Sequence, residues 1–467
     1  MIRIEVHLSD VHLRIDRAAG HLAEQVAAEL RTAIRSGRLA GGAPLPASRN
    51  LARDLELSRG VVVEAYQQLV AEGFVVSRQG SGTRVADLHL PPSDTGRTPA
   101  STTPPAVAYD LRAGTPDLSA FPRRAWLGAV RAVLTAAPHQ ALGYGDPAGV
   151  PEVRAELAAY LRRARAADVG AEQLVVTNGV AQGLHLVIRA LAGSGPVPLA
   201  VEDPHSARTV ALLEAAGAVR VPVPVDRDGI DVEALGRTGA RAVLVTPAHQ
   251  YPTGVVLSPL RRAALTTWAA EVDGVILEDD YDAEFRYDRD PVGCLQGLSP
   301  QRVALLGSVS KTLAPGLRLG WLAAPPPLAE VVRAARAMLD LGSPVIDQLA
   351  LARLLASGAY DRQLRLLRRR YRARRDALVA ALARWLPGAV VHGVSAGIQV
   401  YVELPPHHDE AAVIKAAAGL GVAVEGVAPL RIAGGGPPAL VLGYARLPEH
   451  RITRAVQLLA DAAATTS

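Results

Sequence analysis

Apolar residues follow two different patterns along this 467-residue chain, one on each side of a stretch rich in proline, serine and threonine. Before that stretch they recur three or four positions apart, which is typical of amphipathic helices. After it, short apolar runs alternate with stretches rich in alanine, leucine and arginine. The change predicts two domains of different architecture, and the length also exceeds what one ordinary core accommodates.

The first pattern predicts three helices and a hairpin. Helical spacing of apolar residues covers 21–36, and a shorter helix follows over 47–55 with Ser48 near its start. Ser58 is placed to cap a third helix after a tight turn. Residues 74–85 read as two short strands around a glycine-rich tip. Together these elements form a winged helix-turn-helix.

The second pattern predicts a sheet that is buried on both faces. Uninterrupted apolar runs occur at 174–177, 242–246, 274–277 and 303–307, and helical stretches separate them. Such runs are typical of a mostly parallel sheet in an α/β domain. Ligands bind such sheets where the strands end. The polar and glycine motifs that follow these four runs are therefore the candidate site.

Residues 87–107 form the boundary between the two patterns. They are crowded with proline, serine and threonine and show no apolar period, which is typical of an extended linker. We therefore expect one domain over residues 1–86 and another over 108–467.

Composition narrows the class of protein. No long uninterrupted apolar run occurs, so we expect no membrane span. Acidic residues interrupt the first thirty positions, so we expect no signal peptide and therefore a cytoplasmic location. A single cysteine, Cys294, excludes a disulfide framework and a cysteine-based zinc cluster. The net charge of +5 permits nucleic-acid binding without demonstrating it.

Lysine is unusually rare, because only Lys311 and Lys415 occur among the fifty basic residues. Lys415 lies in an alanine-rich run and reads as a surface residue. Lys311 lies in a loop of small residues with Ser308, Ser310 and Arg318. A lysine amine can lose its proton and attack an aldehyde, whereas hydroxyl and guanidinium groups bind phosphate. This combination indicates a Schiff base with pyridoxal phosphate.

Three further motifs follow the other strands. Residues 177–184 combine a strand, a glycine turn and a helix start, whose backbone amides can hold a phosphate. Residues 247–254 supply polar side chains from a rigid loop. In residues 278–287 a carboxylate can keep a pyridine nitrogen protonated and a tyrosine can bond a ring oxygen. A metal site is the weaker alternative for this acidic segment, since it contains no histidine.

The N-terminal segment resembles the DNA-binding domain of GntR-type regulators. The motifs that carry the resemblance are Arg35–Leu39, Leu45–Ala52, Leu57–Arg59, Ala65–Phe74 and Gly80–Thr83. Arginines at the start of a recognition helix reach base edges or phosphates, and wing glycines let the backbone approach the minor groove. The residues that the resemblance places at DNA are Ser48, Arg49, Ser58, Arg59, Arg78, Gly80 and Gly82.

The larger segment resembles a fold-type I aminotransferase domain, on the strand-end motifs together with residues 110–117 and 144–149. A GntR-type head joined to such a domain is similar to the MocR-type regulators. The resemblance implies that Lys311 forms the Schiff base, Asp279 pairs with the pyridine nitrogen and Tyr281 bonds the ring hydroxyl. The remaining cofactor residues that it implies are Gly179, Val180, Ala181, Ser308, Ser310, Arg318 and Gln250, with Tyr144 from the partner of a homodimer.

Two positions depart from the family pattern. His205 stands where the family has glycine and an aromatic residue after Glu-Asp-Pro, so it is the candidate for stacking on the cofactor ring. Val441 stands where aminotransferases carry the arginine that binds the substrate carboxylate. Losing such a charge-assisted pair costs about 2 to 3 kcal/mol. The candidates to replace it as effector ligands are Arg208, Arg431 and Arg446.

These inferences indicate a pyridoxal-phosphate-dependent transcriptional regulator. We expect residues 20–86 to bind a double-stranded DNA operator, and the larger domain to sense pyridoxal phosphate or an amino compound with weak or absent transaminase activity. The alternative is a working aminotransferase with a vestigial head, and a third reading is a protein that only stores the cofactor. The arginine-dense segment 368–375 reads as a solvated helix face rather than as a second DNA surface.

Overall fold

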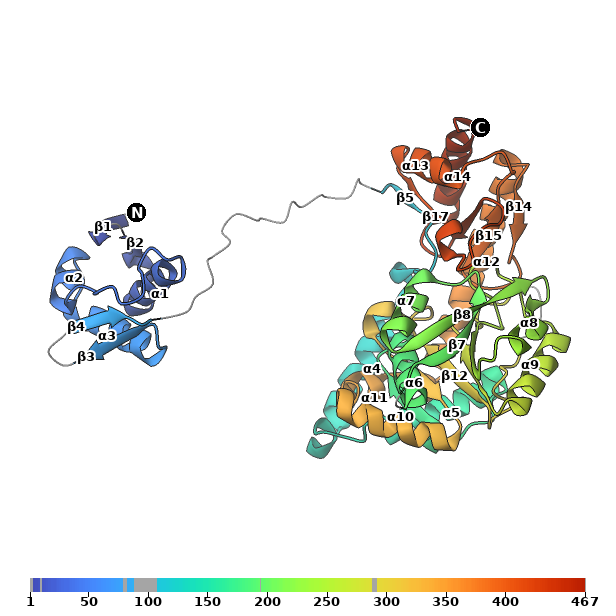
Figure 1. Cartoon of the computed structure of the whole chain (residues 1–467), viewed down its shortest axis with the longest axis horizontal. Helices are drawn as coiled ribbons and strands as arrows, with labels where there is room; N and C mark the ends of the chain where they lie inside the picture. The colour runs from blue at the N-terminus through green and yellow to red at the C-terminus, as the bar shows by residue number, and fades with distance from the viewer. Residues whose placement is uncertain are drawn as a thin grey trace. The chain divides into compact units, whose positions relative to one another are not determined.

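The computed structural model describes residues 3–8, 11–78, 82–87, 107–193, 195–287 and 292–466, although the side chains of residues 3–12 and of Arg78 are excluded from that description. The chain divides into two compact units, Met1–Thr103 and Pro104–Ser467 (Figure 1). We call them the head and the C-terminal unit. The division falls within the predicted linker, of which residues 88–106 lie outside the described part.

The head consists of three helices and two hairpins. Its helices are α1 (Leu22–Arg35), α2 (Ser48–Asp54) and α3 (Arg59–Ala71), and its hairpins pair β1 (Arg3–Leu8) with β2 (Val11–Asp16) and β3 (Val75–Arg78) with β4 (Gly82–Val85). The three predicted helices and the predicted hairpin are confirmed to within two residues at each end. The winged helix-turn-helix is therefore present.

The core of the head explains these elements. Leu30, Leu51 and Leu69, one from each helix, are fully buried together. The Tyr66 hydroxyl donates to the Pro46 carbonyl at 2.9 Å and ties α3 to the loop before α2. The hairpin of β1 and β2 was not predicted, although the alternation of apolar and polar residues that includes the buried Leu13 and Ile15 was a signal for it.

The C-terminal unit is built on an eight-stranded sheet in the order β6-β13-β12-β11-β10-β7-β8-β9. The predicted strands are β6 (Leu174–Thr177), β10 (Ala242–Val245), β11 (Val275–Asp279) and β12 (Val303–Ser308), and the others are β7 (Val197–Asp203), β8 (Ala218–Asp226), β9 (Gly229–Ile230) and β13 (Gly320–Ala323). All four predicted strands are confirmed. The sheet is parallel from β12 to β8, whereas β13 is antiparallel to both of its neighbours.

Helices cover both faces of this sheet (Figure 1). They are α4 (Arg123–Ala136), α5 (Pro151–Arg165), α6 (Val180–Ala192), α7 (Ala207–Ala215), α8 (Val232–Gly236), α9 (Pro259–Glu271), α10 (Pro326–Leu339) and α11 (Val345–Ala356). Strands β6, β10 and β12 are buried along their whole length, because their apolar side chains pack against helices. None of the helices in the described ranges is long and apolar enough to cross a membrane.

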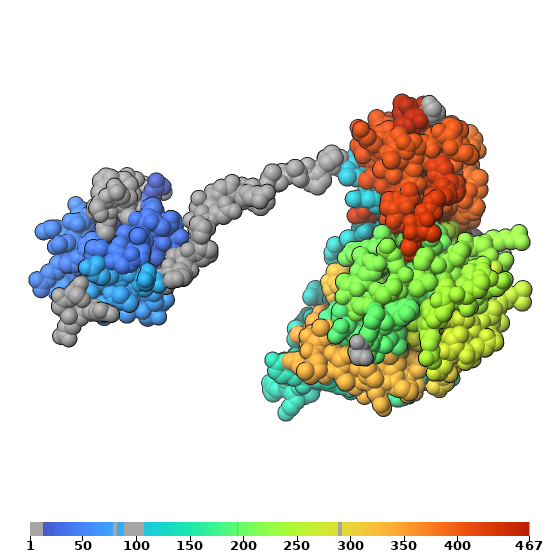
Figure 2. Space-filling view, viewed as in Figure 1, coloured from blue at the N-terminus to red at the C-terminus, as the bar shows by residue number. Residues whose placement is uncertain are grey.

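A smaller C-terminal subdomain lies beside the large sheet and forms a distinct lobe (Figure 2, orange to red). Its antiparallel sheet has the order β14-β15-β18-β17. The elements are α12 (Ala359–Trp385), β14 (Val390–His392), β15 (Gln399–Glu403), α13 (Glu410–Gly419), β16 (Val422–Ala423), β17 (Glu425–Gly426), β18 (Ala439–Gly443) and α14 (Glu449–Ala464). Strand β5 (Tyr109–Asp110) pairs with β16, which brings the start of the unit to this subdomain.

Candidate functional site

The predicted site motifs meet at one edge of the large sheet. Register pairs Ser308 with Gly320 and Gly320 with Thr177, so the ends of β12, β13 and β6 lie in a row. Asp279 ends β11, the next strand beyond β12. The sheet thus brings together segments that are more than a hundred residues apart in the sequence.

One corner of this edge is suited to an anion. Gly179 precedes α6 with φ +86°, and a side chain there would place Cβ 2.9 Å from Nη2 of Arg318. That Nη2 donates to the Asn178 carbonyl at 2.5 Å. The amides of Val180 and Ala181, in the first turn of α6, have no intrahelical acceptor. A guanidinium beside a helix N-terminus is a phosphate-binding arrangement.

The predicted serines lie next to this corner. Ser308 is buried at the end of β12, and its hydroxyl accepts a hydrogen bond from the Ser310 amide at 3.3 Å. Gly320, its partner on β13, has no room for a side chain, because Cβ would lie 2.8 Å from Cα of Gly179. The absence of that side chain lets the strand ends approach the first turn of α6 closely.

Lys311 follows β12 and its amine donates to the carbonyl of Gly114. Burial lowers the pKa of the Lys311 amine, and the carboxylates of Asp282 and Asp279 oppose that effect. A lysine with a lowered pKa has more of its amine in the neutral, nucleophilic form. Lys415, in contrast, lies exposed on α13.

Asp279 presents an unsatisfied carboxylate. Its Oδ1 is buried and has no hydrogen-bond partner among the described residues. Burial raises the pKa of Asp279 to about 7, while the charge of Lys311 acts in the opposite direction. A buried acceptor without a donor is costly. A protonated ring nitrogen would supply the missing donor, so this residue fits a pyridine-type cofactor.

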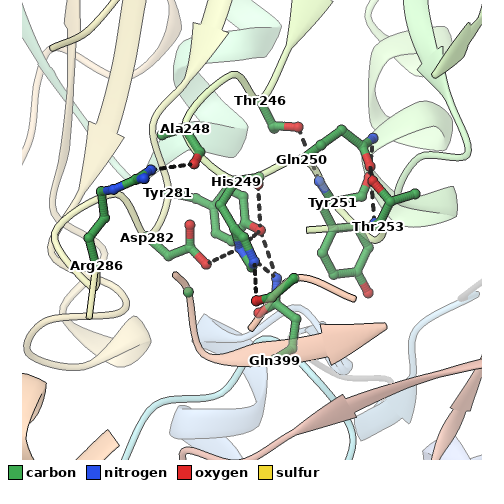
Figure 3. A network of polar contacts seen from close by, with 12 residues as sticks. Thr246, Ala248, His249, Gln250, Tyr251, Thr253, Tyr281, Asp282, Arg286 and Gln399 are labelled. Atoms are coloured by element: carbon green, nitrogen blue, oxygen red, sulfur yellow. Dashed lines mark hydrogen bonds and ion pairs between the residues drawn. The ribbon is translucent and has the colours of Figure 1, made fainter. Parts of the chain in front are cut away.

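Tyr281 belongs to a polar network that joins the large sheet to the C-terminal subdomain (Figure 3). Its hydroxyl donates to the carbonyl of His249 at 3.0 Å and accepts from Nε2 of Gln399 at 2.7 Å. Nδ1 of His249 lies 3.0 Å from Oδ2 of Asp282. No sequence motif pointed to Gln399, because 118 residues separate it from Tyr281.

Two other predicted cofactor residues lie nearby with different surroundings. The Gln250 amide donates to the carbonyls of Pro204 and Tyr251 at 2.9 and 2.7 Å, and its oxygen accepts from Thr253 at 2.6 Å. These bonds tie loops together and leave its cofactor contact a prediction. His205 is buried, its Nδ1 has no partner among the described residues, and burial lowers its pKa to about 4.

The three candidate effector arginines differ in their partners. Arg446 forms an ion pair with Asp110. Arg431 donates to the Tyr401 hydroxyl at 3.2 Å and to the Pro437 carbonyl at 2.5 Å. Arg208 is exposed at the start of α7 and has no hydrogen bond or ion pair with any described residue, yet its charge helps to lower the pKa of Lys311. Arg208 is therefore the candidate whose guanidinium is available.

The arginine-dense helix differs in part from the solvated face that we expected. Arg374 and Arg375 are buried, and Nη2 of Arg374 lies 2.9 Å from the carboxylate of Asp117. Arg368 donates to the Glu284 carbonyl at 2.5 Å. Of the arginines within residues 368–375, only Arg369, Arg370 and Arg372 are exposed. Helical spacing explains this split, because residues on the inner face of α12 pack against the rest of the unit.

In the head, the predicted DNA-binding residues lie at two helix starts and in the wing. Arg49 and Arg59 are exposed in the first turns of α2 and α3, and Ser48 is the half-buried first residue of α2. The exposed Ser58 caps α3 by accepting from the Val61 amide at 3.4 Å. Gly82 opens β4 with φ +78°, whereas the Arg78 side chain and Gly80 lie outside the described part.

Two further expectations concern Tyr144 and metals. Tyr144 is 94% exposed, so its ring makes little contact within its own subunit. Within the described ranges, His, Cys, Asp and Glu form no group of three or more that could hold a metal ion.

Comparison with known proteins places both units in families. Residues 110–459 match aminotransferase class I and II, and residues 22–85 match the bacterial regulatory proteins of the gntR family. The chain is 36% identical to the pyridoxine biosynthesis transcriptional regulator PdxR of Corynebacterium glutamicum, covering 85% of this chain and 86% of that protein. It is 32% identical to the probable rhizopine catabolism regulatory protein MocR of Rhizobium meliloti, covering 94% and 93%.

Among solved structures, the C-terminal unit is similar to the multiple substrate aminotransferase of Thermococcus profundus. The TM-score is 0.72 and the identity 26%, with 78% of this chain and 93% of that chain covered. Aminotransferases of this fold bind pyridoxal phosphate. The Asp279 oxygen, which has no partner among the described residues, and the anion-binding arrangement of Gly179 and Arg318 fit that cofactor. The chain belongs to the MocR-type transcriptional regulators, in which a GntR-type helix-turn-helix head precedes an aminotransferase-like domain that binds pyridoxal phosphate.

Proposed function

We propose that this regulator binds a DNA operator through its winged helix, and that pyridoxal phosphate joined to Lys311 changes its affinity for that operator. The observation that carries the proposal is the buried carboxylate oxygen of Asp279, which has no partner among the described residues and lies near enough to Lys311 for each charge to shift the pKa of the other. A DNA-binding domain does not need such a site, and a transaminase does not need the exposed arginines of α2 and α3.

Each residue at the sheet edge has a distinct task in this proposal. The cofactor supplies an aldehyde that exchanges between amines and a ring that withdraws electrons. Lys311 provides the neutral amine, and Asp279 holds the proton on the ring nitrogen. Arg318 and the first turn of α6 would hold the phosphate, and the Tyr281 hydroxyl would bond the ring oxygen.

Pyridoxal phosphate itself is the effector that this arrangement favours. The relative from Corynebacterium glutamicum is named as a regulator of pyridoxine biosynthesis. The residues at the edge of the large sheet fit the phosphate, the ring nitrogen and the aldehyde of this cofactor. If an amino compound also binds, the unpaired Arg208 is the anchor for its anionic group, since Arg446 is already paired. Arg208→Ala would then weaken the response to that compound and spare the binding of pyridoxal phosphate.

Sustained transamination is the second candidate function, because aminotransferases share this fold. Val441 opposes it: the side chain is fully buried among Tyr401, Val427 and other apolar residues, where no carboxylate can be bound. Without an arginine to bind its carboxylate, an amino-acid substrate is oriented less well and is bound more weakly. Assays of transamination with a panel of amino and keto acids test this second function. We expect no multiple turnover, and rates of about 1 per second or faster would favour the enzyme.

We propose further that the regulator acts in the cytoplasm as a homodimer. Large apolar side chains are exposed on α4 and the loop after it, including Leu127 at 68%, Leu134 and Leu142. Neighbouring residues of α4 and of this loop, among them Val133 and Ala141, line a cavity of about 540 Å³ between α4, α5 and α11. Exposed apolar surface of this kind marks a protein interface. Tyr144, on the same loop, would then reach the site of the partner.

Sedimentation velocity tests the homodimer. We expect a dimer in the wild type and a shift toward monomer when Leu127 and Leu134 are both replaced by glutamate. Wild-type protein that remains monomeric at micromolar concentration would contradict the proposal.

A further inference from the structure

Gln399 is a buried side chain whose two amide atoms have different surroundings. It is the first residue of β15 and is 1% exposed (Figure 3). Its Nε2 donates to the Tyr281 hydroxyl at 2.7 Å, whereas its Oε1 is buried and has no partner among the described residues. A buried acceptor without a donor lowers stability. An apolar side chain would therefore serve packing better, and the hydrogen bond to Tyr281 is the feature that distinguishes Gln399.

The backbone before Gln399 is held tightly against the loop that follows β10. Gly397 has φ +81°, and a side chain there would place Cβ 2.1 Å from Cε1 of His249. The hydroxyls of Tyr287 and Tyr444 each donate to the carbonyl of Gly397 at 2.6 Å. The side chain of Gln399, two residues further along the chain, therefore extends from a fixed position.

The direction of the hydrogen bond between Gln399 and Tyr281 follows from the single proton of the phenol. The Tyr281 hydroxyl donates to the carbonyl of His249 at 3.0 Å. A phenol has no second proton to donate, so Gln399 must present its nitrogen to this hydroxyl. Nδ1 of His249 is engaged with Oδ2 of Asp282 at 3.0 Å. Tyr281 therefore accepts from Gln399, and its own proton is left for an acceptor on another side.

A hydroxyl that accepts one hydrogen bond donates a stronger one. The incoming N–H stabilises negative charge on the phenol oxygen, and hydrogen bonds in a chain polarise one another. The pKa of the Tyr281 phenol reflects this: burial raises it well above its ordinary value, the charge of Asp282 adds to that rise, and the hydrogen bond from Gln399 opposes it. Gln399 thus makes Tyr281 the better donor.

We propose that Gln399 is a positioning residue that directs the Tyr281 hydroxyl as a hydrogen-bond donor to the ring oxygen of pyridoxal phosphate. The inference rests on the proposed function, in which Tyr281 bonds that oxygen. A hydrogen bond to the ring oxygen stabilises its negative charge, so the nitrogen linked at Lys311 holds its proton less tightly. Through Tyr281, the C-terminal subdomain thereby sets the pH at which the bound cofactor changes its protonation state.

Other ionisable groups also act at this place, and the test leaves them unchanged. The groups that face Tyr281 from the elements around it are His249, Tyr251, Asp279, Asp282 and Tyr444. The charged groups that influence Lys311 are Asp282, Asp279 and Arg208. The amide of Gln399 carries no charge. Its replacement by a neutral side chain therefore removes the hydrogen bond to Tyr281 and leaves the charge of the site as it was.

The experiment compares Gln399→Leu, Tyr281→Phe and the double variant in the full-length protein. Leucine is apolar and removes both amide atoms of Gln399. The readout is the pH midpoint of the visible absorption of bound pyridoxal phosphate. Gln296→Leu is the matched control, because Gln296 is also 1% exposed, and its two amide atoms bond to the backbone of Asp168 at 2.8 and 2.7 Å.

We expect Gln399→Leu to raise the midpoint by about half a pH unit or more, which is about threefold in the protonation equilibrium, because Tyr281 becomes a weaker donor. Tyr281→Phe removes the donor and should raise the midpoint further. In the double variant, Gln399→Leu should add nothing to the effect of Tyr281→Phe, since Gln399 acts only through that hydroxyl. Gln296→Leu should leave the midpoint unchanged.

An unchanged or lowered midpoint in Gln399→Leu would overturn the role of Gln399, and so would shifts that add in the double variant. Gln399→Met, with the same expectations, replaces Gln399→Leu if that variant does not fold. Tyr281→Phe separates the two levels of the argument. A midpoint that Tyr281→Phe raises and Gln399→Leu does not refutes only Gln399, whereas a midpoint that neither moves refutes the proposed contact of Tyr281 with the cofactor as well.

Discussion

At the scale of single residues, the site depends on the Lys311 amine and on the buried carboxylate oxygen of Asp279, which has no hydrogen-bond partner among the described residues. Lys311 was recognisable because arginine fills nearly every other basic position, and Asp279 and Tyr281 because they follow a buried strand in one motif. The partners of Tyr281 were not recognisable. Nε2 of Gln399 reaches the Tyr281 hydroxyl only after the C-terminal subdomain folds against the sheet, and the His249 carbonyl that accepts from this hydroxyl lies in the loop after β10. No local pattern in the sequence marks such contacts.

Replacing Lys311 by alanine tests the covalent link. We expect borohydride reduction to fix no cofactor on Lys311→Ala, while Arg318 and the first turn of α6 retain weak noncovalent binding, with affinity lower by at least about tenfold. Lys415→Ala is the matched control and should behave as the wild type, because that side chain is exposed on α13. A peptide map that shows the reduced cofactor on Lys415 would refute the assignment.

Asp279 gives the cofactor-free protein a pH-dependent weakness. Its pKa is raised to about 7 in the fold, from 3.8 when unperturbed, so ionisation opposes folding. This cost is absent below pH 4, grows between pH 4 and 7 and is complete above that range. Without cofactor, Asp279→Asn should therefore be more stable than the wild type at pH 8 by about 1 to 3 kcal/mol, and the difference should vanish at pH 4.

Tryptophan fluorescence during unfolding measures this difference, because all four tryptophans lie in the C-terminal unit. With saturating pyridoxal phosphate, the wild type should become more stable than Asp279→Asn, since the protonated ring nitrogen then donates to the Asp279 carboxylate. A difference that is independent of pH would contradict the burial argument.

At the scale of elements, strands that are buried on both faces were the most predictable. Continuous apolar runs marked β6, β10, β11 and β12, and each has the predicted position. The reversed direction of β13 was not predictable, because its four residues carry no signal of orientation. Direction is set by the pairing of β13 with β12 and β6, which is a property of the whole sheet.

The turn that leads from β6 into α6 should not tolerate a side chain. In Gly179→Ala, Cβ would lie 2.9 Å from the Arg318 guanidinium, and φ would remain at +86°. We expect a loss of about 1 to 3 kcal/mol in the stability of the C-terminal unit, together with weaker binding of pyridoxal phosphate. Gly195→Ala is the matched control, because no atom lies within 4 Å of its Cβ position. Calorimetry with and without pyridoxal phosphate measures the unfolding temperature of each variant and the stabilisation that the cofactor adds.

The first turn of α3 should contribute directly to DNA binding. Arg59 is exposed there and has no ion-pair or hydrogen-bond partner among the described residues. Arg59→Ala should weaken operator binding by about 1 to 3 kcal/mol and leave the cofactor spectrum unchanged. Arg53→Ala, at the far end of α2, controls for the loss of a surface charge. Equal affinities of the wild type and Arg59→Ala would show that α3 is not the recognition helix.

At the scale of the whole molecule, the two-domain organisation followed from composition, since the proline- and serine-rich stretch separates two hydrophobic patterns. The C-terminal subdomain was less accessible to prediction. Its strands are short, and Tyr109 pairs with Val422 across more than three hundred residues. The loop-closure entropy of such a pairing is offset only when the rest of the unit is folded.

The central claim is that occupancy of the Lys311 site controls DNA binding. Sequencing of DNA bound by the purified protein first identifies an operator. The dissociation constant of the full-length protein for that operator, measured at one salt concentration with and without pyridoxal phosphate, then tests the claim. Coupling between two sites in one protein is typically worth 1 to 3 kcal/mol, so we predict a change of at least about fivefold, which Lys311→Ala reduces or abolishes. An operator affinity that is the same with and without the cofactor would contradict the account.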